Sequence, residues 1–151
     1  MADPTLKERL SEEMKDAMRA GEKIRLGALR MLSAAITNRE KEVGHELSDD
    51  EVREVAGREV KRRNESIEAF EKGGRTDLVD KETSERSVVQ PYAPAQLSEA
   101  EVDAMIDEAI AQTGAMSAKE MGRVMGVVMG RAKGRVDGSV VQAKVRERLD
   151  G

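Results

Sequence analysis

The sequence predicts an all-α protein, with a four-helix N-terminal domain resembling a bundle and a small three-helix C-terminal domain. Apolar residues recur every three or four positions along most of the 151-residue chain, which is the period of an amphipathic helix. The chain has one Phe, one Tyr and no Trp, so Leu, Ile, Val, Ala and nine Met must form the core. Such a core suits helices better than sheets.

Four helices are expected in an N-terminal domain over residues 1–92. The first is expected to begin at Pro4, with Asp3 as its cap, because proline favours the first helical position. Its apolar stripe consists of Leu6, Leu10, Met14 and Met18. The second helix is expected over residues 23–43, ending at Gly44. Its apolar face consists of Ile24, Ala28, Met31, Leu32, Ala35 and Ile36.

Capping and helix-breaking residues delimit the next two helices. Ser48 and Glu51 have the i, i+3 spacing of a capping box, so a third helix is expected to begin there. The glycines at 73–74 end it, and a fourth helix is expected from Thr76. The prolines of QPYAPAQL then end the fourth helix and indicate the domain boundary.

The C-terminal domain, residues 95–151, is expected to contain three helices. The capping-box pairs that open its first two helices are Ser98 with Glu101 and Ser117 with Glu120. The last helix is expected over residues 139–149, with Asp137 or Ser139 as its cap.

Residues that commonly carry catalysis are scarce. The chain has no cysteine, and its one histidine, His45, lies in a predicted loop, where a solvated side chain is the more common outcome. No P-loop, GxGxxG, GxSxG or HExxH motif occurs, so we expect no catalytic residues, cofactor or metal. The lack of cysteine, of an apolar signal segment and of a bilayer-spanning apolar run favours a cytoplasmic protein.

Two basic features suggest contacts with phosphate. Arg58, Lys61 and Arg62 are spaced to share one helix face. Residues 115–149 contain eight cations and three acids, a net charge of +5, whereas residues 95–114 contain five acids and no cation. Such one-sided charge can steer a protein onto a phosphate backbone. The alternative is a balanced surface on which these charges pair internally.

A ladder of glycines runs through the C-terminal domain. Its members are Gly122, Gly126, Gly130, Gly134 and Gly138, and the methionines Met121, Met125 and Met129 precede the first three. This spacing predicts a stripe of glycines along one side of a helix, which the backbone of another segment can approach closely. Core packing is the expected use of the methionines, ahead of an adaptable groove for a partner.

The end of this ladder, VMGRAKGRVDGSVV at residues 128–141, fits a phosphate-binding loop, a packing seam or a surface that binds nucleic acid. Each glycine inside a helix costs roughly 1 kcal/mol relative to alanine, so the helix is expected to end between Gly130 and Gly134. Residues 131–138 would then form a basic turn near the N-terminus of the last helix, where a phosphate can bind.

Four segments resemble the GatB/YqeY family. They are RLGALRMLSAAITN at 25–38, ESIEAFEKGGRTDLVDKE at 65–82, the interdomain stretch QPYAPAQLSEAEVDAMIDEAI and the tail MGRVMGVVMGRAKGRVDGSVV. This family includes stand-alone bacterial chains and the C-terminal tail of the B subunit of glutamyl/aspartyl-tRNA amidotransferase. Residues matching the family's tail motif are Met121, Gly122, Val124, Met125, Gly134, Arg135, Asp137, Gly138 and Val141. This chain departs from the family at YAPAQL and at two of the ladder glycines, which lowers its positive charge or local order.

The resemblance implies a helical N-terminal bundle, a three-helix tail domain and an association with tRNA. It also implies a carbon–nitrogen ligase label with glutamine as amide donor, although the amidotransferase's glutaminase and kinase chemistry lies in other domains. We therefore expect a non-catalytic module that binds tRNA or accompanies a tRNA amidotransferase. The expected RNA contacts are Arg131, Lys133 and Arg135, helped by Lys119 and Arg123, with Arg58, Lys61 and Arg62 as a second group. The alternative is a protein-interaction adaptor without an RNA role.

Overall fold

A computed structural model describes residues 3–132 and 135–150, and every regular element in these ranges is helical. The chain forms two compact units, Met1–Pro94 and Ala95–Gly151. The elements of the first unit are α1 (Leu6–Ala20), α2 (Lys23–Val43), α3 (Asp49–Lys72), α4 (Thr76–Val89) and the short 3₁₀ helix η1 (Gln90–Tyr92). Those of the second are α5 (Glu99–Thr113), the 3₁₀ turn η2 (Ala118–Glu120), α6 (Met121–Ala132) and α7 (Gly138–Asp150). The predicted all-α fold is confirmed.

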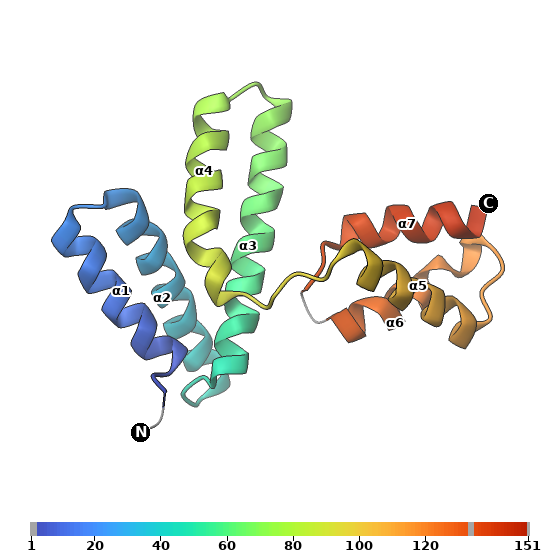
Figure 1. The fold of residues 1–151 in the computed structure, drawn as a ribbon, viewed down its shortest axis with the longest axis horizontal. Coiled ribbons are helices and arrows are strands. Elements are labelled where there is room, and N and C mark those ends of the chain that lie inside the picture. The colour runs from blue at the N-terminus through green and yellow to red at the C-terminus, as the bar shows by residue number, and fades with distance from the viewer. Residues whose placement is uncertain (1–2, 133–134, 151) are drawn as a thin grey trace. The chain divides into compact units, whose positions relative to one another are not determined.

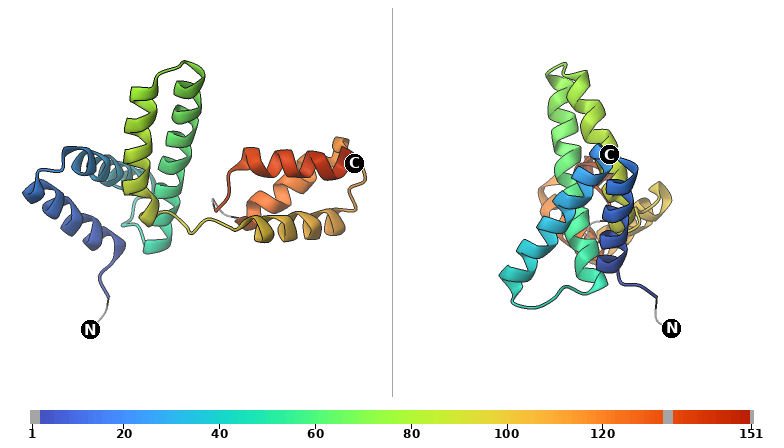
Figure 2. Two further views of the ribbon diagram at one scale, coloured as in Figure 1. Left: turned by 45° about the horizontal axis from the view of Figure 1, so that its top comes forward. Right: turned by 90° about the vertical axis from the view of Figure 1, so that its left-hand side faces the viewer.

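The first unit consists of two helical hairpins. α1 packs against α2, α3 packs along α4, and α2 also contacts α4, as Figures 1 and 2 show. Their shared core is formed by Leu6, Leu10, Ala17, Ala28, Leu29, Leu32, Ile36, Leu47, Val52, Val55, Ala56, Val60, Val89 and Tyr92. The boundaries of α2 match the predicted range 23–43, because Gly44 adopts the left-handed conformation that ends the helix.

The start of α1 differs from the prediction. The N-cap is Thr5, whose Oγ1 accepts a hydrogen bond from the Glu8 amide at 3.1 Å. The Glu8 carboxylate in turn accepts from the Thr5 amide at 3.3 Å, which completes a capping box. Because this reciprocal pair satisfies the helix end, Asp3 is not the cap and Pro4 precedes the helix rather than opening it.

Two predicted apolar faces of the first unit are only partly buried. Met18 is 57% exposed, and Ala17 is buried in its place, because an i+4 row drifts by about 40° per step around a helix. On α2, Ile24 and Met31 are 53% and 52% exposed, whereas Leu32 is fully buried. The core face of α2 is therefore shifted from the predicted one, with Leu29 buried and Ile24 and Met31 exposed.

The second unit packs α5, α6 and α7 around one core. Its buried members are Val102, Ile106, Ala109, Ala115, Val124, Val128, Val141 and Val145. The methionines of α6 are half-buried against this core, which confirms their predicted packing role. The predicted capping box of Ser98 and Glu101 forms, with the Ser98 hydroxyl 3.1 Å from the Glu101 amide.

The second predicted box of this unit does not form. Ser117 makes no side-chain capping bond, and the Glu120 carboxylate accepts from the Met116 amide at 2.6 Å instead. The segment between them is a 3₁₀ turn, and α6 begins at Met121. The Glu side chain therefore reaches one residue farther back than a capping box requires.

Candidate nucleic-acid interface

The predicted basic turn lies between α6 and α7. α6 ends at Ala132, within the predicted interval, and the Asp137 side chain accepts from the Ser139 amide at 2.9 Å at the start of α7. Two members of the turn, Lys133 and Gly134, lie outside the described residues. The described arginines that flank these two residues are Arg131 and Arg135.

Arg135 joins this turn to the segment that precedes α5. Its Nε donates to the Ala95 carbonyl at 2.8 Å, and its own carbonyl accepts from the Leu97 amide, also at 2.8 Å. The side chain is half-buried. Arg135 thus has a structural role that its basic character alone did not reveal.

The two arginines of α6 reach across to α5. Arg131 pairs with Glu108 at 3.2 Å and donates to the Gln112 side chain at 2.8 Å. Arg123 donates to the Thr113 carbonyl at 3.3 Å, near the C-terminal end of α5. Arg131 therefore has a carboxylate partner, whereas Arg123 contacts no carboxylate among the described residues.

The acids of α5 also pair with the cations of α7. Lys144 lies 3.1 Å from Glu99 and 2.9 Å from Asp103, and Arg148 lies 3.2 Å from Asp103 and 2.9 Å from Asp107. The hydrogen bond from Lys144, reinforced by Arg148, lowers the pKa of Asp103. The same contact raises the pKa of Lys144. Four of the five acids of residues 95–114 thus pair with cations of α6 and α7, which balances part of the charge separation in the sequence.

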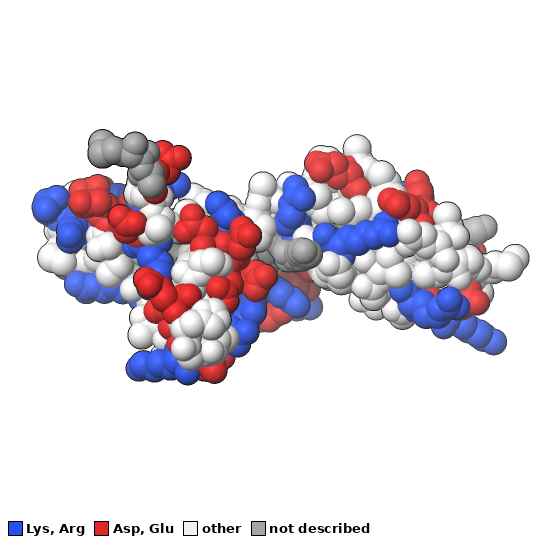
Figure 3. Space-filling view, turned by 90° about the horizontal axis from the view of Figure 1, so that it is seen from below, with Lys and Arg blue, Asp and Glu red and all other residues white. Residues whose placement is uncertain are grey.

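The second predicted group lies on α3. Arg58, Lys61 and Arg62 are all exposed, and Arg62 pairs with the buried Glu59 at 3.6 Å. Within the described part of the chain, neither Arg58 nor Lys61 forms an ion pair. In the second unit, the exposed Lys119 is likewise without an ion pair in the described ranges. On the face drawn in Figure 3, basic and acidic side chains are interspersed over each unit.

Sequence reasoning overlooked Arg63, the next residue of this basic segment. Arg63 is 4% exposed and pairs with Glu82, at 3.2 Å, and with Glu85, both on α4. Its position could have been found, since Arg63 occupies the same helical row as the buried Val60 and Ile67. The arginine therefore joins the two helices of the α3–α4 hairpin rather than facing solvent.

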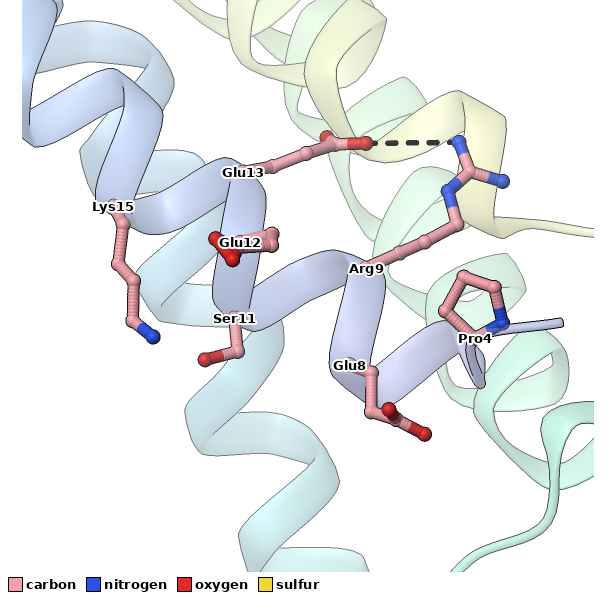
Figure 4. A pocket seen from close by; sticks show the side chains of 7 residues that line it. All are labelled: Pro4, Glu8, Arg9, Ser11, Glu12, Glu13 and Lys15. Carbon is pink, nitrogen blue, oxygen red and sulfur yellow. Dashed lines mark ion pairs between the residues drawn. The ribbon is translucent and has the colours of Figure 1, made fainter. Parts of the chain in front are cut away.

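A hollow lies on the outer face of α1. It has a volume of about 390 Å³ and is lined by Pro4, Glu8, Arg9, Ser11, Glu12, Glu13 and Lys15, as Figure 4 shows. Arg9 and Glu13 pair across it at 3.6 Å. All of these side chains come from a single helix and the residue before its cap, so the hollow is an open surface feature.

No cluster suited to a metal occurs in residues 3–132 or 135–150. His45 is exposed in the α2–α3 loop, 3.7 Å from Glu51, in agreement with its predicted solvation. None of the described helices is long and apolar enough to cross a membrane.

These features define a class of protein: an all-helical module of two compact units, in which exposed cations are the candidate contacts for nucleic acid. The family described as Yqey-like protein matches residues 7–149, and the chain belongs to this family. The chain is also similar to two proteins that are each named altered inheritance of mitochondria protein 41, mitochondrial.

The protein of Lachancea thermotolerans is 33% identical over 107 residues, which cover 68% of this chain and 57% of the relative. That of Pyrenophora tritici-repentis is 34% identical over 104 residues, which cover 68% and 58% of the two chains. The chain thus spans a little under three fifths of the length of these curated relatives.

Proposed function

We propose that this YqeY-like chain is a non-catalytic helical module that binds tRNA through its sugar–phosphate backbone. The observation that carries the proposal is the exposed α3 face with Arg58 and Lys61, which lack carboxylate partners among the described residues. Lys119 and Arg123 supply a second pair of such cations in the other unit. The resemblance to the amidotransferase tail supports tRNA as the nucleic acid.

The composition supports recognition of backbone and shape rather than of bases. The chain has two aromatic residues, and Tyr92 is buried, so stacking on bases has almost no side chains available. Lysine and arginine contacts to phosphate release counterions, which makes binding strongly dependent on salt. Arg131 and Arg135 have internal partners, so the proposal gives them a lesser share of the binding.

Fluorescence anisotropy with labelled tRNA tests this proposal on the full chain. The double variants Arg58→Glu/Lys61→Glu and Lys119→Glu/Arg123→Glu should each lower the affinity at least tenfold. Each should also lower the slope of log K against log salt by about two, since about one counterion is released per contact. Lys15→Glu is the matched control, because Lys15 is an exposed cation outside both groups. Absence of tRNA binding at low salt would refute the proposal.

A second candidate function is that of a protein-interaction adaptor. The methionines of α6 do not support it, because they pack against the core of the second unit. An exposed surface on α2 favours it.

A further inference from the structure

The solvent side of α2 has the spacing of a coiled-coil seam. Ile24, Gly27, Met31, Ala34 and Asn38 follow one another at intervals of three, four, three and four residues, and all five are exposed. This spacing places them at the a and d positions of two heptads, where a helix contacts a partner helix. The buried face of α2 contains other residues, Leu29, Leu32 and Ile36 among them. The seam is therefore additional to the contacts that build the first unit.

The two large side chains of the seam flank a notch. Ile24 and Met31 are seven residues apart, roughly 10 Å along the helix, with Gly27 between them. A Cβ atom placed on Gly27 would meet no atom within 4 Å, so the space above this residue is open. Arg63 donates to the Met31 sulfur at 3.6 Å, which holds the methionine while 52% of it stays exposed. The notch can receive one apolar side chain from a partner.

One edge of this seam is basic. Lys23 and Arg30 lie at consecutive g positions, immediately before Ile24 and Met31, and both are exposed. Neither forms an ion pair among the described residues, although Arg25 on another face of α2 pairs with Glu13 at 3.5 Å. Charges at the g positions of a coiled coil select the partner through pairs with its flanking residues.

We propose that this α2 seam is a docking site for an amphipathic helix of a protein partner, with apolar residues facing Ile24, Gly27 and Met31 and acidic residues facing Lys23 and Arg30. The seam from Ile24 to Asn38 is about 21 Å long, which matches a partner helix of about four turns. Two large apolar side chains separated by a glycine notch suit the knobs of a helix. They offer little to a phosphate backbone and do not form the broad apolar face that lies on a lipid surface.

Two labelled helical probes of about three heptads test this site with the full chain. Both carry Leu at a and d, and one has Glu and the other Lys at the flanking e and g positions. In fluorescence anisotropy at nanomolar probe concentration, the acidic helix should bind at least tenfold more tightly than the basic helix. In the double variant Lys23→Glu/Arg30→Glu, the basic helix should instead bind more tightly than the acidic helix, because like charges then face the acidic probe.

Substitutions in the seam separate docking from folding. Gly27→Glu should abolish binding of the acidic probe while leaving the circular dichroism and thermal unfolding of the chain intact, since the site is open and helical. Met116→Glu is the matched control, because Met116 is 88% exposed but lies in the other unit. Gly27→Glu should also leave tRNA affinity unchanged, which distinguishes this site from the proposed RNA contacts.

Several results would overturn the inference. These are equal binding of the two probes, no binding of either, or binding that Gly27→Glu leaves unchanged. Sedimentation showing a dimer that Gly27→Glu dissociates would assign the seam to a second copy of this chain. Association with phosphatidylserine vesicles that requires Ile24, without binding of the acidic helix, would assign it to a membrane surface.

Discussion

Arg63 of α3 donates to Glu82 of α4 at 3.2 Å although the arginine is 4% exposed. The same guanidinium pairs with Glu85, and the Met31 sulfur of α2 lies 3.6 Å from its second terminal nitrogen. One buried side chain of α3 therefore contacts two other helices of the first unit, α2 and α4. It holds the α3 face that presents Arg58 and Lys61 in a fixed relation to α2 and α4.

The Arg63→Ala substitution should destabilise the first unit by about 3 kcal/mol, because it leaves Glu82 without its cation and Glu85 with only the longer pair to Lys81 at 4.0 Å. Urea unfolding followed by circular dichroism measures the change. Adding Glu82→Gln and Glu85→Gln should recover part of the loss, since the uncompensated charges are then removed. Arg53→Ala is the control, because Arg53 is 43% exposed and its partner Asp50 is 91% exposed, so its loss should change stability by less than about 0.5 kcal/mol. Equal losses in Arg53→Ala and Arg63→Ala would contradict this assignment.

The ionisation of Tyr92 should coincide with unfolding. Burial raises the pKa of this phenol above its ordinary value near 10, and the nearby Glu13 carboxylate adds to the effect. The folded state therefore keeps a proton that the unfolded state loses. The resulting stabilisation is fully present below pH 10 and is lost as the pH rises toward the folded pKa.

Tyr92 is the only tyrosine and there is no Trp, so near-ultraviolet absorbance reports this one group. On alkaline titration, the tyrosinate signal should appear in a single step together with the loss of helical circular dichroism. A gradual tyrosinate signal centred near pH 10, with the helices intact, would show that the phenol is not buried.

The ion pairs between α5 and α7 should make the second unit sensitive to acid. Hydrogen bonds from Lys144 and Arg148 lower the pKa of Asp103 in the folded state. The stabilisation that Asp103 gives the second unit is therefore fully present above its ordinary pKa, near 4, and is lost as the pH falls through its pKa in the folded state. Asp103→Asn should therefore lower the unfolding temperature at pH 7 and have little effect near pH 2.

Methyl resonances of Val141 and Val145 report the unfolding of this unit, since both side chains are fully buried in its core. Glu147→Gln is the control, because Glu147 is exposed on α7 and forms no ion pair in the described ranges. The prediction would be contradicted if Asp103→Asn lowered the unfolding temperature by the same amount at pH 7 and at pH 2.

Interactions between neighbouring residues account for most of what the sequence predicted correctly. The boxes at Ser48 and Ser98 each need only a Glu three residues later, and both form. The same rule failed at Ser117, where Glu120 binds the Met116 amide instead. The i, i+3 spacing indicates that a capping bond is possible. Whether it forms depends on the other backbone amides that the Glu carboxylate can reach.

Interactions between distant residues were not predictable from spacing. Residues 95–114 and 115–149 carry opposite charge along the chain, yet Asp103 meets both Lys144 and Arg148 once the helices pack. A linear charge count cannot separate a one-sided surface from an internally paired one. The predicted RNA contacts at Lys119 and Arg123 remain predictions for the same reason, since the charge pattern does not determine what binds there.

The glycine stripe of α6 shows a similar ambiguity, because i+4 spacing is the same whether a stripe faces a neighbouring helix or solvent. Gly122, Gly126 and Gly130 are exposed, and a Cβ atom on any of them would meet no atom within 4 Å. The predicted close backbone approach is therefore wrong within the described structure. Their cost to helix stability is not offset by packing.

Gly126→Ala should for this reason stabilise the second unit by about 1 kcal/mol, because alanine has the higher helix propensity and the added methyl group enters open space. Urea unfolding followed at the Val145 methyl resonance should show a higher midpoint with an unchanged slope. Gly114→Ala is the matched control and should destabilise the same unit, since Gly114 ends α5 with φ of 67°. Destabilisation by Gly126→Ala would show that this glycine is packed against another backbone and would restore the packing-seam interpretation.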